Sequence, residues 1–472
     1  MKKSKPSLDE RWVLLGDATD KSISDVIKRG ATHAEAFLTD TLVTEVFIRN
    51  SEIFAENVTS DAGVGFRVAV DGEKVGFACT NLVDQKAIAQ SAHKALDIAK
   101  VSAVVPHFSL PSPTEIPRVS GLYDKRVEAI DVQDVVNIAR RVIETAEGHD
   151  SRVIAKTGVV SYQIGKRRVI NSLGVDTEEK LTRCFIYLGG VGEEANEVTP
   201  SCDDYELKRS ADINPEVIGK NVAETVIAQL KPRKIDSFEG TAVFEPAAVA
   251  YQLFDAIVGA LRGDAVANRR SAWANRIGEV VVSDNLEISD AATLKDGFGS
   301  RCFDDEGHPS QRTEITRKGK LQCFLQNATS ANTLKMENTG NASRDIAAGG
   351  LDMTRSIIGG GYRSKPGIYP SNLTIRPGNK TKSELISEVE KGVLVEAMSG
   401  FVQAGSGLIS AQLSRAHLIQ NGEVQYPIRG GMVSGIAFDW LMNVSGIGRE
   451  TKQSQNAVVP SLRIERVKVL GG

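Results

Sequence analysis

Residues 244–266 read FEPAAVAYQLFDAIVGALRGDAV and predict a helix of about four turns that is buried on most of its sides. Pro246 suits the first helical position because its missing N–H would have no partner there. Arg262 followed by Gly263 suits the end of a helix. Asp255 stands alone in the apolar run, and a carboxylate in such surroundings needs either a partner or a function.

The residues before this helix alternate between helical and extended patterns. Helices are predicted at four places: 22–29, 84–100, 131–147 and 215–231. Extended segments are predicted at five places: 34–38, 43–49, 152–163, 166–174 and 178–190. Ser22 and Asp25 resemble a capping box at the start of the first helix, and Asp71-Gly72 is expected to form the tight turn of a hairpin.

Residues 101–123 contain four prolines among polar residues, which favours an extended linker. We therefore place a boundary near residue 115. The chain is expected to divide into an N-terminal α+β domain (1–115), a central α+β domain (116–235) and a C-terminal β-rich domain (236–472). The predicted fold class is α+β, with helices on antiparallel sheets in the N-terminal half and few helices in the C-terminal domain.

The composition excludes several classes of protein. The 472 residues are 41% hydrophobic and 25% charged, with a formal net charge of −3, and contain no run of about 18 apolar residues. These values predict a soluble globular protein that binds neither membranes nor nucleic acid. The first residues, MKKSKPSLDERW, lack the apolar segment of a secretory signal, and five scattered cysteines argue against a disulfide framework. We expect a cytoplasmic protein.

Motifs for common hydrolytic chemistry are missing. No two of the six histidines have the spacing of a zinc-binding helix, and none occurs between His149 and His308. The serine-nucleophile motif GxSxG and the phosphate-binding P-loop are also missing. Ser406 lies between Gly405 and Gly407, and the simplest interpretation of these residues is a tight glycine turn.

The segment FDDEGHPSQRT, residues 303–313, groups Asp304, Asp305 and Glu306. Their oxygens could bind a cation, but no further acidic ligands follow at the spacing of an EF-hand. The simpler interpretation is a solvated β-turn that leads into a strand–turn–strand unit with Lys318-Gly319 at its tip.

Four linked motifs occur between residues 301 and 448: RCFDDEGHPSQRTEITRKGKLQCFLQNATSANTL, TGNASR, PSNLTIRPGNKTKSELISEVEKGVLVEAMSG and LIQNGEVQYPIRGGMVSGIAFDWLMNVSGIG. With these motifs the chain resembles the TldD/PmbA family, also called TldD/TldE, over essentially its whole length. The resemblance implies an α+β N-terminal half and a β-rich C-terminal domain. It also implies a pair of subunits that together degrade unfolded or flexible peptides: a zinc-dependent peptidase, TldD, and a companion without metal, TldE or PmbA.

In the active subunit of that family a helix carries HExxxH, and FDAIVGALRGD occupies its place here. Phe254 and Gly259 stand where the family has its histidines, and Asp255 stands where it has its glutamate. Neither a phenyl ring nor a hydrogen atom can coordinate zinc, and a carboxylate without a metal is a weak catalyst of amide hydrolysis. The family's cysteine ligand also lacks a counterpart, since no cysteine follows Cys323. Asp255 is then a remnant or a hydrogen-bonding strut, or it pairs with Arg262.

These implications lead to the hypothesis of a TldE/PmbA-type, non-catalytic partner of a TldD-type zinc metallopeptidase. Such a pseudoenzyme has no cofactor of its own, and the zinc is expected in the partner subunit. An extended peptide substrate would be held as an added strand at a sheet edge. The alternatives are a stand-alone homodimer that binds peptides or another ligand, and a hydrolase with Ser406 or Cys302 as its nucleophile.

The walls of the substrate chamber are expected to be formed by acidic residues and glycine-rich turns. The candidates are Asp304, Asp305, Glu306, Gly405, Ser406, Gly407, Gly349-Gly350, Gly359-Gly360-Gly361 and Gly430-Gly431.

Overall fold

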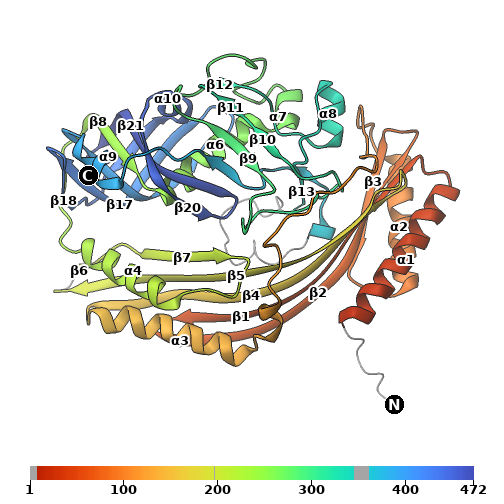
Figure 1. Cartoon of the computed structure of the whole chain (residues 1–472), viewed down its shortest axis with the longest axis horizontal. Coiled ribbons are helices and arrows are strands. Elements are labelled where there is room, and N and C mark those ends of the chain that lie inside the picture. Colours follow the sequence, from red (N-terminus) through yellow and green to blue (C-terminus); the bar gives the residue numbers. More distant parts are fainter. Residues whose placement is uncertain (1–7, 196, 345–360) are drawn as a thin grey trace.

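The computed structural model describes residues 8–195, 197–344 and 361–472. Its N-terminal half forms one curved seven-stranded antiparallel sheet, and the C-terminal half lies over the concave face of that sheet (Figure 1). The strand order is β3-β2-β1-β4-β5-β6, with β7 also paired to β5. The strands are β1 (His33–Arg49), β2 (Glu52–Val70), β3 (Lys74–Thr80), β4 (Val153–Asn171), β5 (Asp176–Glu194), β6 (Glu197–Val198) and β7 (Cys202–Lys208).

Helices cover the other face of this sheet. They are α1 (Leu8–Lys28), α2 (Gln85–Val101), the short 3₁₀ helix η1 (Lys125–Ala129), α3 (Val132–His149) and α4 (Pro215–Ala228). The side chains of Asp84, Asp131 and Asn214 accept hydrogen bonds from the first turns of α2, α3 and α4. The three helices that the sequence predicts at these caps are therefore confirmed.

The start of the first helix differs from the sequence prediction. Ser22 does not cap a helix but lies inside α1, where its hydroxyl donates to the carbonyl oxygen of Ala18 at 2.7 Å. A serine within a helix can satisfy its hydroxyl on the preceding turn, so the pattern of Ser22 and Asp25 alone does not mark a helix start.

Long strands replace two pairs of predicted short ones. Segments 34–38 and 43–49 belong to the single strand β1, and segments 152–163 and 166–174 lie mostly in the single strand β4, which ends at Asn171. The Asp71-Gly72 turn is confirmed, since both residues have positive φ angles, of 53° and 79°.

The predicted boundary near residue 115 does not divide this sheet. β1 pairs with β4 from Glu35, opposite Asn171, to Arg49, opposite Thr157. The two parts that the sequence separates therefore share a continuous hydrogen-bonded ladder and form one layer.

The C-terminal half is rich in strands, which confirms the predicted fold class. Its main sheet contains β8 (Phe238–Phe244), β9 (Ile288–Ala291), β10 (Arg312–Glu314), β15 (Leu373–Ile375), β16 (Lys391–Val402), β17 (Leu408–Gln420), β18 (Glu423–Pro427), β19 (Met432–Ile436), β20 (Val444–Ser454) and β21 (Ala457–Leu470). Because β8 pairs with both β16 and β21, the strands β8, β16, β17, β19 and β21 close into a ring.

Smaller elements complete this half. Two minor hairpins pair β11 (Thr316–Arg317) with β12 (Lys320–Leu321) and β13 (Ala342–Ser343) with β14 (Gly367–Ile368). The helical segments are α5 (Pro246–Ala248), η2 (Val249–Leu253), α6 (Phe254–Leu261), α7 (Gly263–Ala267), α8 (Ala328–Leu334), η4 (Gly361–Arg363), α9 (Lys382–Ser387) and α10 (Ala437–Met442). None of the helices in the described part of the chain combines the length and the apolar character of a membrane span.

Candidate functional site

The helix that the sequence predicts over 244–266 is one rod with an irregular turn. Pro246 starts α5, the π-helical turn η2 follows, and α6 ends at Leu261, with Arg262 as its cap. A π-helical turn within an α-helix often occurs at a functional site. Here it lies directly before Phe254 and Asp255, the positions singled out by the sequence.

Phe254 and Gly259, the two positions expected for the family's histidines, lie in different surroundings. Phe254 and Asp255 line a cavity of about 380 Å³ between α6 and the concave face of the N-terminal sheet. Gly259 instead packs against the turn between β16 and β17, where an added Cβ would lie 2.6 Å from the Cβ of Ala404. Five residues of an α-helix correspond to a rotation of about 140° between the two side chains, so Phe254 and Gly259 do not share a face.

The sequence predicts that Asp255 is enclosed in the core, but the structure exposes its side chain to the cavity. Its predicted ion pair with Arg262 is wrong, because Arg262 binds Asp264 at 2.7 Å. No hydrogen bond or ion pair joins Asp255 to any residue of the described ranges. Partial burial by the cavity walls raises the pKa of this carboxyl group.

This end of the cavity does not fit a zinc ion. Phe254 offers a phenyl ring, Gly259 offers no side chain, and the remaining carboxylate of Asp255 is a single ligand. Within residues 8–195, 197–344 and 361–472, no three His, Cys, Asp or Glu side chains form a cluster that could hold a metal ion.

The acidic residues after Phe303 are buried, so their interpretation as a solvated turn is wrong. Asp304 accepts from the backbone N–H groups of Glu306 and His308, both at 2.9 Å. Asp305 accepts from Arg167 at 2.5 Å, and Glu306 accepts from Arg67 at 2.8 Å. These bonds tie the C-terminal half to β4 and β2 of the sheet, and of the three acids only Asp305 lines the cavity beside Asp255.

Ser406 and Cys302 lack the surroundings of an activated nucleophile. Ser406 is exposed in the turn between β16 and β17, next to Gly407 with its φ of 72°, and its hydroxyl donates to Gln403 at 2.8 Å. No described histidine forms a hydrogen bond with it. Burial, followed by the charge of Glu179, raises the pKa of the Cys302 thiol and so keeps it protonated.

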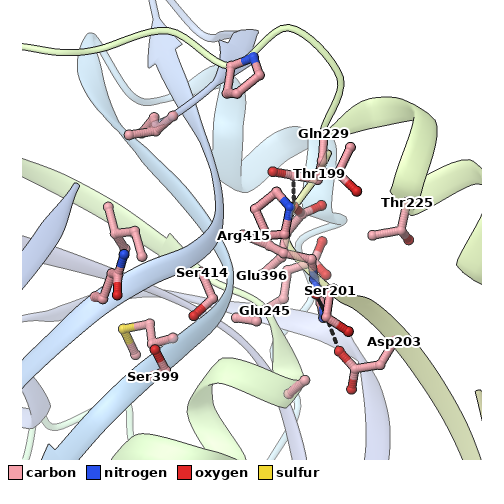
Figure 2. A pocket seen from close by; sticks show the side chains of 18 of the residues that line it. Thr199, Ser201, Asp203, Thr225, Gln229, Glu245, Glu396, Ser399, Ser414 and Arg415 are labelled. Atoms are coloured by element: carbon pink, nitrogen blue, oxygen red, sulfur yellow. Dashed lines mark hydrogen bonds and ion pairs between the residues drawn. The ribbon is translucent and has the colours of Figure 1, made fainter. Parts of the chain in front are cut away.

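A second and larger cavity, of about 1400 Å³, lies between α4 and β7 on one side and β16 and β17 on the other (Figure 2). Arg415 from β17 reaches across it and forms an ion pair with Asp203 from β7. Neither residue belongs to a motif that is recognisable in the sequence. Gly430 lines this cavity and Gly361 lines the smaller one, whereas Gly349, Gly350, Gly359 and Gly360 lie outside the described residues.

Glu396 projects into the large cavity from a β-bulge in β16. The pairing with β17 passes from Val395 to Ala397 and leaves Glu396 as the extra residue. Its carboxylate accepts from Gln229 at 3.1 Å and lies 3.4 Å from Nδ1 of His417. Burial opposes its ionisation, but the contact with His417 outweighs this effect and lowers the pKa of Glu396. Its position as a lone acid in the apolar run VLVEAM is the sequence signal that could have indicated this residue.

The fold and the two cavities define an α+β protein in which a ring of strands covers a long curved sheet and encloses polar cavities against it. Sequence models of three domains match in chain order: "PmbA/TldA metallopeptidase domain 1" over residues 34–99, the central domain over 125–230 and the C-terminal domain over 238–471. The chain belongs to the PmbA/TldD family, which confirms the resemblance seen in its motifs.

Individual relatives agree with this assignment. The chain is 25% identical to "Metalloprotease PmbA" of Escherichia coli O157:H7, over 93% of this chain and 92% of that protein. It is 24% identical to "Metalloprotease TldD homolog" of Buchnera aphidicola, over 95% of both. The crystal structure of TldE from Thermococcus kodakarensis superimposes with a TM-score of 0.87 at 21% identity, covering 96% of this chain and all of that one, a likeness of fold alone.

Proposed function

We propose that this chain is the non-catalytic subunit of a TldD/TldE-type zinc peptidase that acts on unfolded or flexible peptides. One observation carries the proposal: the helix that bears HExxxH in active members has Phe254 in the cavity and Gly259 packed on Ala404. A zinc site would therefore be supplied by the partner subunit. All five cysteines are free thiols, which fits the cytoplasmic location that we propose.

The large cavity is the part of this subunit that we assign to the peptide. β7 pairs with β5 on one side, and no strand of the described residues covers its other side. Asp203, Asp204 and Tyr205 of β7 line the cavity. An extended peptide could pair with this free edge through its main chain, a mode that needs little sequence preference and so suits unfolded substrates.

Co-assembly tests the proposal. The chain and a TldD-type subunit from the same organism would be purified separately and mixed, and the complex would be followed by light scattering, zinc analysis and peptide cleavage. We expect a heteromeric complex that cleaves peptides and loses activity with a chelator, while this chain alone carries no stoichiometric zinc and cleaves nothing. A self-dimer that ignores the partner would favour a stand-alone binding protein, and cleavage by this chain alone would overturn the non-catalytic role.

Strand addition has its own test. Two peptides of the same sequence would be compared, one with alternate backbone amides N-methylated. Because methylation removes the main-chain donors but keeps the side chains, the methylated peptide should bind at least about tenfold more weakly. Equal binding would mean that side chains, rather than the edge of β7, hold the peptide.

A further inference from the structure

The floor of the smaller cavity is a polar patch on an otherwise well-packed sheet. Alternate residues of β1, β4 and β5 point to the same face, as the two-residue repeat of a strand requires. Those that line the cavity are Phe37, Thr39, Thr41, Gln163, Gly165, Arg167, Glu179, Leu181 and Arg183. This face is therefore built to meet something polar.

The charges around this cavity are mainly positive on the sheet side. Its described lining contains four arginines and three acids: Arg167, Arg183, Arg209, Arg301, Glu179, Asp255 and Asp305. Arg167 is neutralised locally, since it binds both Glu179 and Asp305. Lys166 also borders the cavity, but its ammonium group binds Asp9 of α1 instead.

Arg209 carries a buried positive charge in this cavity. Only 3% of the residue is exposed. Its guanidinium donates to three backbone carbonyl oxygens, those of Ser300 at 2.8 Å, Thr182 at 3.2 Å and Gly297 at 3.4 Å. No carboxylate of the described residues forms an ion pair with it. Burial, followed by repulsion from Arg183, lowers the pKa of Arg209 to about 9, so the group is still charged at neutral pH.

Two further polar side chains line the same cavity. Gln163 is 1% exposed and Thr39 is 7% exposed, yet among the described residues neither Oε1 of Gln163 nor Oγ1 of Thr39 has a hydrogen-bond partner. Buried polar atoms are rarely left in this state, because each loses its bonds to water. Gln163 lies opposite Arg183 in the pairing of β4 with β5, in the same row of the sheet as Arg209, which follows β7. Thr39 lies one strand and four residues further away, opposite Arg167. Gln163 is therefore the polar group that accompanies Arg209.

We propose that this cavity binds the carboxylate group of a peptide, with Arg209 as its counter-ion and Gln163 as a hydrogen-bonding neighbour. The proposal rests on the peptide-handling function above and adds where one end of the peptide lies. Tyr251 lines both cavities, and β7, which borders the large one, ends at Lys208, next to Arg209. A peptide that extends along β7 would therefore reach Arg209 with one terminus.

Binding to the chain alone tests this site. Acetyl-Ala-Ala-Phe would be titrated by calorimetry as the free acid and as the C-terminal amide, together with acetyl-Glu-Ala-Phe-amide. A hydrogen-bonded charge partner predicts that the free acid binds about tenfold or more tightly than the amide. Recovery of the affinity by the glutamyl amide would identify a side-chain carboxylate as an equal ligand. Equal affinity for all three peptides, or no binding by any of them, would overturn the proposal.

Substitutions in the cavity test whether the carboxylate binds beside Arg209. Arg209→Gln should abolish the preference for the free acid, Arg209→Lys should retain part of it, and the matched surface variant Arg376→Gln should keep it fully. Asp255→Asn should strengthen binding of the free acid, because it removes a negative charge from the opposite wall. If Arg209→Gln does not fold, Gln163→Leu replaces it and should also reduce the preference. A preference that survives in both variants would contradict this site, whereas the co-assembly test can succeed or fail independently.

Discussion

Glu396 and His417 show how a single bulge creates a charged pair in the wall of a cavity. His417 is 7% exposed, and its Nε2 lies 3.1 Å from the carbonyl oxygen of Ala228. Burial disfavours the charged imidazole, but Glu396 outweighs this effect and raises the pKa of His417 above its usual 6.5. The pair therefore joins β16 and β17 to the end of α4.

Replacing this histidine should make stability depend differently on pH. A raised pKa means that His417 stabilises the fold fully below about pH 6.5 and that this contribution is lost as pH rises through the folded-state pKa. His417→Gln should lower the free energy of unfolding by about 1–3 kcal/mol near pH 6 and by less at pH 9. Urea unfolding at both pH values measures this, with the exposed His149→Gln as control. A loss that is independent of pH would contradict the charged pair.

Glu45 on β1 should change stability with pH in a different way, because its charged form costs stability. It is 4% exposed, its only described partner is the hydroxyl of Ser161 at 3.3 Å, and burial raises its pKa. A raised carboxyl pKa costs stability as pH rises above the unfolded value. Glu45→Gln should therefore stabilise the protein by about 1 kcal/mol at pH 7 and by little at pH 4, as thermal unfolding can show. Destabilisation at pH 7 would mean that the charge of Glu45 is needed.

At the scale of elements, the helix α6 and the turn between β16 and β17 are in direct backbone contact. An added Cβ at Gly259 would lie 3.0 Å from the carbonyl oxygen of Ala404 as well as close to its side chain. Backbone atoms cannot yield as a flexible side chain can. Gly259, the position expected for the family's second histidine, therefore has no empty space beside it.

This contact predicts that histidines at positions 254 and 259 would not create a zinc site. Gly259→Ala should destabilise the protein by about 1–3 kcal/mol, and Phe254→His with Gly259→His should give no stoichiometric zinc binding. The matched control is Gly148→Ala near the end of α3, where an added Cβ meets nothing within 4 Å. That change should be neutral or stabilise by about 0.5 kcal/mol. Tight zinc binding by the double variant would contradict this packing argument.

The helices were more predictable than the strands for a physical reason. The caps at Asp84, Asp131 and Asn214 are local signals and appear in the sequence. The long strands β1 and β4 were divided because polar residues such as Thr39 interrupt the apolar pattern of β1 and Gly165 interrupts that of β4. On β1 these residues face a cavity and not the core, so only the tertiary structure explains why they are polar. The same holds for Glu396, whose role depends on a bulge and on His417.

At the scale of the whole molecule, buried ion pairs connect the two halves. Arg67 of β2 binds Glu35 of β1 at 2.6 Å and Glu306 at 2.8 Å, and Arg344 also binds Glu35. Burial, opposed by the charge of Arg67, raises the pKa of Glu306 to about 6. This network was not evident from the sequence, because its members are far apart in the chain.

Breaking this network of ion pairs between the N-terminal and C-terminal halves should destabilise the protein. Arg67→Met leaves Glu306 without its cation, so the free energy of unfolding should fall by about 3–5 kcal/mol at pH 8. The loss should be smaller at pH 5, because an unpaired buried acid takes up a proton more easily. Urea unfolding followed by tryptophan fluorescence measures both, with the exposed pair of Arg376 and Glu287 providing the control variant Arg376→Met. A loss below about 1 kcal/mol, the range of exposed pairs, would contradict the network.

The ring of strands has a consequence for biosynthesis. β8 is the first strand of the C-terminal half to leave the ribosome, but one of its two neighbours, β21, is the last. Until β21 emerges, the nascent polypeptide carries unsatisfied strand edges and bare apolar surface, which favour aggregation. The folding of this protein should therefore depend on chaperones that shield the unfinished ring during translation.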